Sequence, residues 1–432
     1  MKNNNNVPST NIPDPYQKKN YRYYVLGMLT TTYMFSFVDR QILAILQEPI
    51  KAELGLSDTQ LGLLSGFAFA IFYIVLGLPI ARWADRGIRR NIIVYALGLW
   101  SVMTALCGLA QNYTQLLLAR MGVGVGEAGC APASHSMIAD MFPIKGRVTA
   151  LATLHTGVNA GMLVGFLLGG WVLEFFGWRA ALLTVGIPGL LLALVIRVTV
   201  REPIRASAGK PLNTVVAHPT LLQTARLLFS KRTFRFMVFG GALCAFTSYG
   251  LFSWMPSFLS RSYGLSPGII GTWLALSIGV GGAIGTFLSG FIADKLGARD
   301  RRWYCWAMAL TSALSLPFVA GVFLADDSRL SLLLFIVPAA LAAGYVAPLI
   351  TVTHSLVDNN MRAVSSALVL FILNIIGLGI GPVAIGYLSD LLVSGFGLES
   401  LRYALLILMS LSFVACIFCF LWSSRYIRSE MD

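Results

Sequence analysis

Four charged residues lie within long apolar segments of the sequence, where charge is costly. Asp39 and Arg40 are neighbours in the first such segment, and Arg120 and Glu127 lie seven residues apart in the fourth. On membrane-insertion scales each charge at a helix centre costs about 2.5–3.5 kcal/mol, so four that face lipid would cost roughly 10–14 kcal/mol. Seven helical residues span almost two turns, about 10 Å, which places Arg120 and Glu127 on one helix face. We therefore expect all four side chains to face the interior of a helix bundle or an aqueous cavity.

Carboxylates beside arginines can bind and release protons, and this is the chemistry that the four residues offer. We predict that Asp39 and Glu127 are the proton-coupling acids, and that Arg40 and Arg120 are their charge partners or bind substrate. Protonation of either acid would loosen its pairing with an arginine and bias the cavity toward one side of the membrane. Two interacting acids titrate as a pair, so the sequence does not assign the proton to one of them.

Three further polar residues are candidate contacts in the same cavity. His135 lies eight residues after Glu127 and can extend a proton path. His155 and Asn159 lie one helical turn apart in the next apolar segment. Each of the three can equally be a hydrogen-bonded residue of helix packing, and the sequence leaves both roles open.

The elements that must position these residues are membrane helices. Of the 432 residues, 56% are hydrophobic and 12% are charged, and the mean hydropathy is +0.74. Soluble proteins have about 25% charged residues, so lipid is the solvent for this chain. A helix of about 20 apolar residues crosses the bilayer. The sequence predicts twelve such spans, near 22–47, 58–82, 91–110, 114–139, 147–173, 179–200, 234–260, 267–292, 303–324, 331–356, 363–392 and 401–424.

The predicted spans divide into two halves around a basic interruption. Loops on one side carry clusters of Arg and Lys, whereas the opposite loops carry single positive residues. The positive-inside rule then places both termini and the interruption in the cytoplasm. We expect a disordered cytoplasmic tail at 1–20, a six-helix half at 21–200, a cytoplasmic central loop at 201–233, a second six-helix half at 234–424 and a cytoplasmic tail at 425–432.

The two halves repeat one another in sequence, with an offset of 209 in one block and 216 in a second. Two six-helix halves with a site between them are typical of secondary transporters. At these offsets the four charged residues align with uncharged ones, which argues against the alternative of a static ion-pair cluster that only supports the fold. The matches are residues 55–57 with 264–266, Gly62 with Gly271, residues 84–86 with 293–295, Pro132 with Pro348, Gly161 and Gly165 with Gly377 and Gly381, and Gly170 with Gly386; the charged residues align with Ser248, Tyr249, Ile336 and Ala343.

Several motifs resemble those of the major facilitator superfamily, over nearly the whole chain. The loops ARWADRGIRR and GFIADKLGAR, after the second and eighth spans, are similar to the family's GxLADRxGRR loop, although Ala81 replaces the leading glycine of the first copy. The segments FSFVDRQILAILQEPIKAELGLSDTQLG and RMGVGVGEAGCAPASHSMIADMFP resemble the bacterial branch of the spinster group. The resemblance implies an all-α membrane protein of twelve transmembrane helices in two pseudo-symmetric six-helix halves. It also implies a multi-pass location in a bacterial inner membrane.

The same resemblance implies a gate at the cytoplasmic ends of the spans. Asp85 and Asp294 would close the inner side by pairing across the halves with the first residues of spans eleven and five. A carboxylate at a helix N-terminus is electrostatically favourable. A salt-bridged surface loop is the alternative. The implied gate residues are Asp85, Arg86, Arg89, Arg90, Asp294, Lys295, Arg147 and Arg362.

These features predict a secondary active transporter, coupled to protons, that moves an amphipathic or lipid-like small molecule by alternating access. A proton symporter for a small organic anion is the alternative, because Arg40 and Arg120 can both bind a carboxylate. A membrane enzyme or a receptor is less favoured, since the sequence has no visible nucleophile or metal constellation and no soluble output domain. We therefore expect no cofactor and no metal. The expected partners are the substrate, protons and membrane lipid, with no nucleic acid, and the expected state is a monomer.

Overall fold

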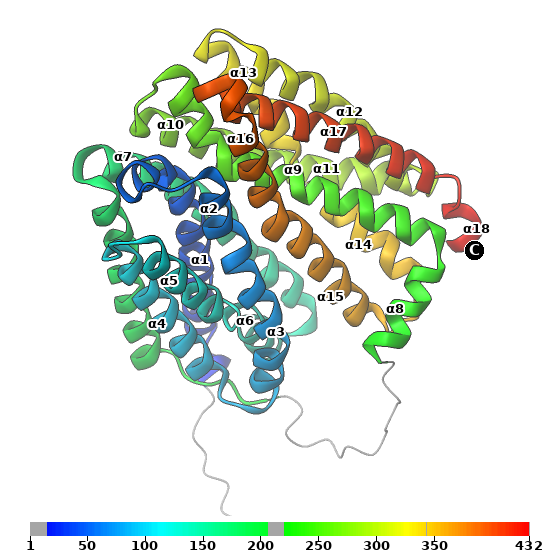
Figure 1. Cartoon of the computed structure of the whole chain (residues 1–432). Helices are drawn as coiled ribbons and strands as arrows, with labels where there is room; N and C mark the ends of the chain where they lie inside the picture. The colour runs from blue at the N-terminus through cyan, green and yellow to red at the C-terminus, as the bar shows by residue number, and fades with distance from the viewer. Residues whose placement is uncertain (1–14, 206–219, 343, 432) are drawn as a thin grey trace, which may run out of the picture.

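The chain forms helices and no strands within the residues that the structure describes, which are 15–205, 220–342 and 344–431 of this computed structural model (Figure 1). The first half contains η1 (Pro15–Gln17), α1 (Lys19–Leu54), α2 (Asp58–Gly62), η2 (Leu63–Phe67), α3 (Ala68–Arg86), α4 (Arg89–Gly108), α5 (Tyr113–Glu127), α6 (Cys130–Met141) and α7 (Ile144–Thr199). The remainder contains α8 (Leu221–Ser230), α9 (Arg232–Tyr263), α10 (Pro267–Leu274), η3 (Ala275–Gly281), α11 (Gly282–Gly297), α12 (Trp303–Leu324), α13 (Ser328–Leu341), α14 (Val346–Ser355), α15 (Arg362–Leu373), η4 (Asn374–Ile380), α16 (Gly381–Phe396), η5 (Gly397–Glu399), α17 (Ser400–Ser423) and α18 (Ile427–Met431).

These helices form twelve membrane-spanning segments, as the sequence predicts. By length and composition, eight continuous helical stretches of the described chain can cross a membrane. Two of them turn back on themselves, Ile144–Thr199 at Gly177 and Arg362–Ser423 at Gly397, so the eight stretches supply ten segments. The other two segments are α1 and the α5–α6 pair, which contain the four charged residues. The predicted fold class is therefore confirmed.

Four tight turns on one face of the bundle depend on glycine. Gly55, Gly177, Gly264 and Gly397 have φ angles of 65°, 80°, 63° and 54°, a region that residues with a side chain rarely adopt. Gly55 ends α1 and Gly264 ends α9, and the offset of 209 relates the two. We call this end of the molecule the turn face. The opposite end, where α1 begins and where α8 and α18 lie, is the terminal face.

The two halves pack closely at the turn face, where α2 contacts α16 and α7 contacts α10 (Figure 1). On each of four glycines at these contacts, an added Cβ would lie 2.3–2.5 Å from a backbone oxygen of the other half. Only glycine permits such an approach of two helix backbones. The four glycines are the repeat pairs Gly62 with Gly271 and Gly170 with Gly386.

The clusters of buried apolar residues also differ between the two ends of the molecule. A core cluster toward the turn face combines both halves, with Ile45 and Phe166 packed in one cluster with Trp254 and Ile385. Toward the terminal face, one cluster consists almost entirely of first-half residues and another of second-half residues. The halves therefore share a core at the turn face and have separate cores at the terminal face.

We expect Gly271→Ala to lower the thermal stability of the protein, because the added methyl group would lie 2.3 Å from the Phe166 carbonyl oxygen. Overpacking of this kind typically costs about 1–3 kcal/mol. The check is the melting temperature of the purified variant by scanning fluorimetry. Gly98→Ala is the matched control, since no atom lies within 4 Å of a Cβ added there. Equal melting temperatures for the two variants would contradict the tight packing assigned to this contact.

The structure differs from the predicted tails and loop at their boundaries. Residues 1–14 and 206–219 lie outside the described residues, but Tyr16, within the predicted first tail, is packed against the bundle. The ring of Tyr16 is buried 5.2 Å from that of Tyr21, and its hydroxyl donates a hydrogen bond to the Arg201 carbonyl oxygen. The predicted central loop includes α8 and the start of α9, and the predicted final tail includes α18.

Candidate functional site

The four intramembrane charges meet between α1 and α5 as two separate ion pairs. Arg120 Nη1 lies 3.1 Å from Asp39 Oδ1, and the Thr104 hydroxyl of α4 donates a hydrogen bond to Asp39 Oδ2. Arg40 Nε and Nη2 each lie 2.8 Å from Glu127 Oε2. The structure thus brings together the four residues that the sequence singles out. Thr104 is a further member that sequence reasoning missed, because a single threonine in an apolar span has no distinguishing pattern.

Glycines allow the helices to hold these side chains at such short range. A Cβ on Gly124 of α5 would lie 2.5 Å from the Phe69 carbonyl oxygen of α3, and one on Gly126 would lie 2.7 Å from the Trp100 amide nitrogen of α4. On α7, Gly161 makes the same kind of approach to α1. The glycine-rich run GVGVGEAG therefore serves helix packing around Glu127, the last residue of α5.

The two ion pairs differ in how much of their surface is exposed. Asp39 and Arg120 are 1% and 2% exposed, so the described structure seals this pair from solvent. The carboxylate of Glu127 is also buried, whereas the Arg40 side chain keeps 12% of its surface exposed. In this conformation all four residues therefore face the interior of the bundle, and Arg40 is the one that keeps some exposed surface. Two acids and two arginines together carry no net charge.

One carboxylate oxygen of Glu127 has no hydrogen-bond partner in the part of the chain that the structure describes. Its Oε2 accepts from the Ser36 hydroxyl at 2.7 Å and from Arg40, while Oε1 is buried without a partner among the described residues. A buried carboxylate oxygen left in this way is costly and gains stability by binding a proton, a water or a ligand donor.

Aromatic rings enclose the Arg40 guanidinium. Its central carbon lies 5.0 Å from the centroid of Phe37, 4.8 Å from Phe69 and 4.7 Å from Tyr73, distances typical of cation–π contacts. Tyr249 of the second half belongs to the same cluster of packed residues as Tyr73. The partly exposed charge of Arg40 is thus surrounded by large, flat apolar surfaces at the boundary between the halves.

The predicted polar contacts on α6 and α7 lie toward the terminal face from the ion pairs. The rings of His135 and His155 are 5.5 Å apart, and Tyr33 lies 6.4 Å and 5.6 Å from them. His155 is exposed, and the Nε2 atom of His135 is buried without a hydrogen-bond partner among the described residues. Tyr33 lies seven residues before Arg40 on α1, about 10 Å along the axis. Asn159 is half-buried one turn after His155.

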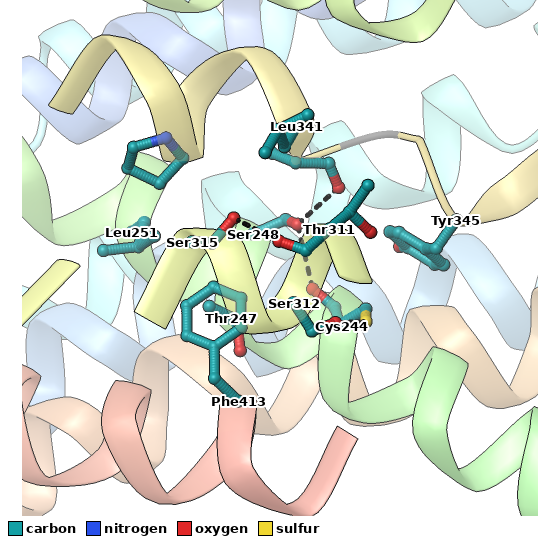
Figure 2. Close-up of a pocket in the computed structure, with 12 residues that line it drawn as sticks. Cys244, Thr247, Ser248, Leu251, Thr311, Ser312, Ser315, Leu341, Tyr345 and Phe413 are labelled. Carbon is teal, nitrogen blue, oxygen red and sulfur yellow. Dashed lines mark hydrogen bonds between the residues drawn. The ribbon is translucent and has the colours of Figure 1, made fainter. Parts of the chain in front are cut away.

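The second half has a small neutral cavity where the first half has its buried charges. It lies among α9, α12, α13 and α17 and has a volume of about 20 Å³. Half of its lining residues carry a hydroxyl group and most of the others are apolar (Figure 2). Ser248, which aligns with Asp39, donates to the carbonyl oxygens of Cys244 and Ala342 at 2.9 Å. A cavity of this size has room for one water molecule. The charges are therefore a feature of one half and not a general requirement of the fold.

At the turn face, an ionic network joins the halves, and we call Glu48, Lys51, Asp58 and Arg261 the turn-face latch. Arg261 of α9 donates to both oxygens of Asp58 at 2.7 Å and to Glu48 at 2.8–3.0 Å. The Asp58 side chain has no exposed surface and also accepts from Lys51 at 2.6 Å. In the sequence, Lys51 and Arg261 are two of the single positive residues in the loops that lack clusters of Arg and Lys. Positive residues are rare on this face, and each of these two lies near an acid. This pattern could have indicated the ionic network.

Two carboxylates at the turn face cap helices that belong to the other half. Asp390 of α16 accepts from the amide nitrogens of Asp58 and Thr59 at 3.0 and 2.8 Å, at the start of α2. Glu174 of α7 accepts from the Gly268 amide nitrogen at 2.7 Å, at the start of α10. The repeat offsets of 216 and 209 relate the two arrangements. Each stabilises a helix N-terminus by charge and hydrogen bonding, so both favour contact between the halves.

The structure describes the side chains of only some residues of the implied cytoplasmic gate. The side chains of Asp85 and Asp294 lie outside the described residues. Arg89 is buried and pairs with Asp140 and with Glu202, the latter at 2.7 Å. The side-chain hydrogen bonds recorded for Arg90 and Arg147 also stay within residues 1–205. The described contacts of Arg86, Lys295 and Arg362 include no ion pair that joins the halves.

Comparisons with known proteins agree with this architecture. A model of the Major Facilitator Superfamily matches residues 29–382. An MFS-type efflux pump of Mycolicibacterium smegmatis is 34% identical over 410 residues, 94% of each chain. A cis,cis-muconate transport protein of Acinetobacter baylyi is 30% identical over 308 residues, 69% of this chain and 71% of the relative. The crystal structure of a bacterial homologue of the human lysosomal transporter Spinster, inward-facing and unoccupied, matches with a TM-score of 0.83 and 30% identity, over 96% of this chain and 98% of that one.

Proposed function

The chain belongs to the Major Facilitator Superfamily of membrane transporters, in its spinster-like group, and from that premise we propose that it moves amphipathic molecules in exchange for, or together with, protons. The observation that carries this proposal is the pair of buried acid–arginine contacts between α1 and α5, which has no charged equivalent at the aligned positions of the second half.

Charge neutrality supplies the coupling in this proposal. The site balances two carboxylates against two arginines, so protonation of one acid leaves one buried arginine without a counter-charge. An uncompensated buried charge is strongly unfavourable. The site regains balance when an anionic group binds the released arginine, or when the halves move and expose that arginine to water. Proton binding, substrate binding and conformation are thereby linked.

Glu127 is the acid that we assign to the first protonation. Its Oε1 has no partner among the described residues, and its arginine, Arg40, is the more exposed of the two. His135, His155 and Tyr33 lie together on the terminal-face side of this carboxyl group, and in this proposal they pass protons toward it. Asp39, sealed with Arg120 and Thr104, would change protonation only after the halves rearrange.

We assign the described conformation to the inward-open state. The halves share a core, a latch and two helix caps at the turn face, whereas their cores are separate at the terminal face. The cluster of positive loops on the terminal face favours a cytoplasmic location for it, with both termini inside. In the outward-open state the turn-face contacts would be broken, and the gate residues around Asp85 and Asp294 would close the cytoplasmic side.

The aromatic enclosure of Arg40 supports an amphipathic substrate. The rings of Phe37, Phe69 and Tyr73 offer an apolar surface beside a positive group, so a molecule with an acyl or aromatic body and a polar head fits both. The chain is also similar to an MFS-type efflux pump over 94% of its length. The alternative is a symporter for a small organic anion. It is supported by the ability of Arg40 to bind a carboxylate and by the similarity to a muconate transport protein.

A flux assay in proteoliposomes tests the proposal. Purified protein is reconstituted, a pH gradient is imposed, and uptake is screened over lysophospholipids, sphingoid compounds, aromatic drugs and organic acids. We expect the gradient to accelerate movement of at least one amphipathic class and to have no effect on protein-free vesicles. Gradient-driven flux of organic acids alone would favour the symporter. Flux that follows a sodium gradient and ignores the pH gradient would overturn proton coupling.

A further inference from the structure

A large apolar groove runs along the outer surface of the second half, away from the site between the halves. It is lined by residues of α9 and α17, with Phe229 of α8 and Ile372 of α15, and has a volume of about 1110 Å³. Figure 1 shows the helices α9 and α17, with α8 and α18 at the terminal face. Its walls include Phe239, Leu411, Val414 and Phe418, which are 54–63% exposed. An apolar surface of this kind on a membrane protein lies against acyl chains.

Two arginines lie at the terminal-face end of the groove. Arg232 and Arg235 line it and are exposed. Among the described residues their guanidinium groups have no carboxylate partner, because the nearby Glu430 carboxylate accepts from the backbone amides of Arg232 and Thr233 instead. The Arg232 guanidinium lies 5.3 Å from the ring centroid of Tyr426, which also lines the groove. Arg425 stacks on the Trp422 ring at 4.4 Å next to them. The groove thus has arginines and aromatic rings at its terminal-face end and an apolar surface along its length. This order matches the phosphate, glycerol and acyl zones of a phospholipid.

We propose that this groove is a binding site for an anionic phospholipid of the leaflet at the terminal face. The lipid phosphate accepts hydrogen bonds from Arg232 and Arg235, because a guanidinium presents its donors in a fork that fits phosphate oxygens. The acyl chains lie along α9 and α17 against Phe239 and Phe418. This site is separate from the proposed transport site and does not depend on it.

Charge argues against a second copy of the chain as the occupant. A symmetric dimer through this groove would bring the same surface of both copies together, and so would place two sets of these arginines near one another. An anionic lipid headgroup instead supplies a counter-charge. A zwitterionic lipid supplies a phosphate but also a cation, which the arginines would repel.

Native mass spectrometry of the delipidated protein tests this site. We would add phosphatidylglycerol or phosphatidylcholine with identical acyl chains and compare the wild type with Arg232→Gln/Arg235→Gln. We expect wild type to retain phosphatidylglycerol in preference to phosphatidylcholine, and the double variant to bind phosphatidylglycerol about tenfold or more weakly, as two surface arginines predict.

The matched control is Lys145→Gln/Arg197→Gln, which removes two exposed positive charges from the terminal face at a distance from the groove. It should bind phosphatidylglycerol like the wild type, and all proteins should elute as one symmetrical peak. Equal binding of the two lipids, or equal loss of phosphatidylglycerol in both double variants, would overturn the proposal. A dimer that only the groove variant dissociates would assign the groove to a second copy.

Discussion

Asp39→Asn should abolish the acceleration of transport by a pH gradient while leaving substrate exchange measurable. Asparagine has nearly the shape of aspartate and can still accept a hydrogen bond from Thr104, but it cannot bind and release a proton. Gradient-driven uptake in proteoliposomes should fall to the rate seen without a gradient. Counterflow of labelled against unlabelled substrate, which needs no net proton movement, should persist.

A loss of protein stability in the Asp39→Asn variant must be distinguished from a loss of proton coupling. The neutral amide of the Asp39→Asn variant leaves Arg120 buried without a counter-charge, and breaking a buried pair on one side typically costs about 3–5 kcal/mol. The double variant Asp39→Asn/Arg120→Gln removes both charges and should recover much of the lost stability without recovering the response to the gradient. Glu53→Gln is the control for loss of an acid on α1, because Glu53 pairs with Arg179 at the exposed turn face. Wild-type proton coupling in the Asp39→Asn variant would refute the assigned role.

The fold was predictable from the sequence because a membrane imposes simple length and polarity rules. Twelve apolar segments, two halves and the glycine pairs all follow from composition, hydropathy and the two repeat offsets. Gly62 with Gly271 and Gly170 with Gly386 are matched in the sequence, and in the structure each lies against the backbone of the other half. A glycine has no side chain to gain by burial, so its recurrence at matched positions indicates a backbone approach.

The location of the charged site was also predictable, but its pairing was not. The cost of charge in a bilayer predicts that Asp39, Arg40, Arg120 and Glu127 face inward. Which acid meets which arginine depends on the rotation of α1 against α5. That rotation is set through other helices, by the glycine contacts of α5 with α3 and α4 and of α7 with α1. Spacing along one helix cannot supply that information. The exposure that distinguishes Arg40 from Arg120 likewise arises only from the packing of the other helices.

The turn-face latch escaped prediction for a related reason. Asp58 follows the sequence Gly-Leu-Ser and looks like an ordinary residue in the first turn of a helix, with Ser57 and Gln60 forming a capping box. Its buried partner Arg261 lies 203 residues later. The family resemblance implies carboxylate–helix contacts at the cytoplasmic ends of the spans, around Asp85 and Asp294. In this conformation the described contacts of that type lie at the opposite end, where Asp390 and Glu174 cap α2 and α10.

Arg261→Gln should release the turn face and shift the protein toward the outward-open state. Arg261 contacts Glu48 and Asp58 across the halves, and its loss leaves Lys51 as the cation that pairs with the buried Asp58 carboxylate. The lost hydrogen bonds to charged groups would remove about 3 kcal/mol from the closed turn face, which changes the equilibrium by about two orders of magnitude. Transport should slow, because a protein held in one state cannot complete the cycle.

A cysteine at Ser253 reports the shift directly. Ser253 is 8% exposed and hydrogen-bonds to Gln47 and Ser65 across the halves, and the six native cysteines are buried. A membrane-impermeant maleimide added from the turn-face side should label Ser253→Cys slowly in the wild-type background and much faster with Arg261→Gln. The matched control is Arg402→Gln, because Arg402 pairs with Glu399 inside the second half. Slow labelling in both the wild-type and the Arg261→Gln backgrounds would contradict this prediction. It would mean that the shared core and the two helix caps keep the turn face closed without the turn-face latch.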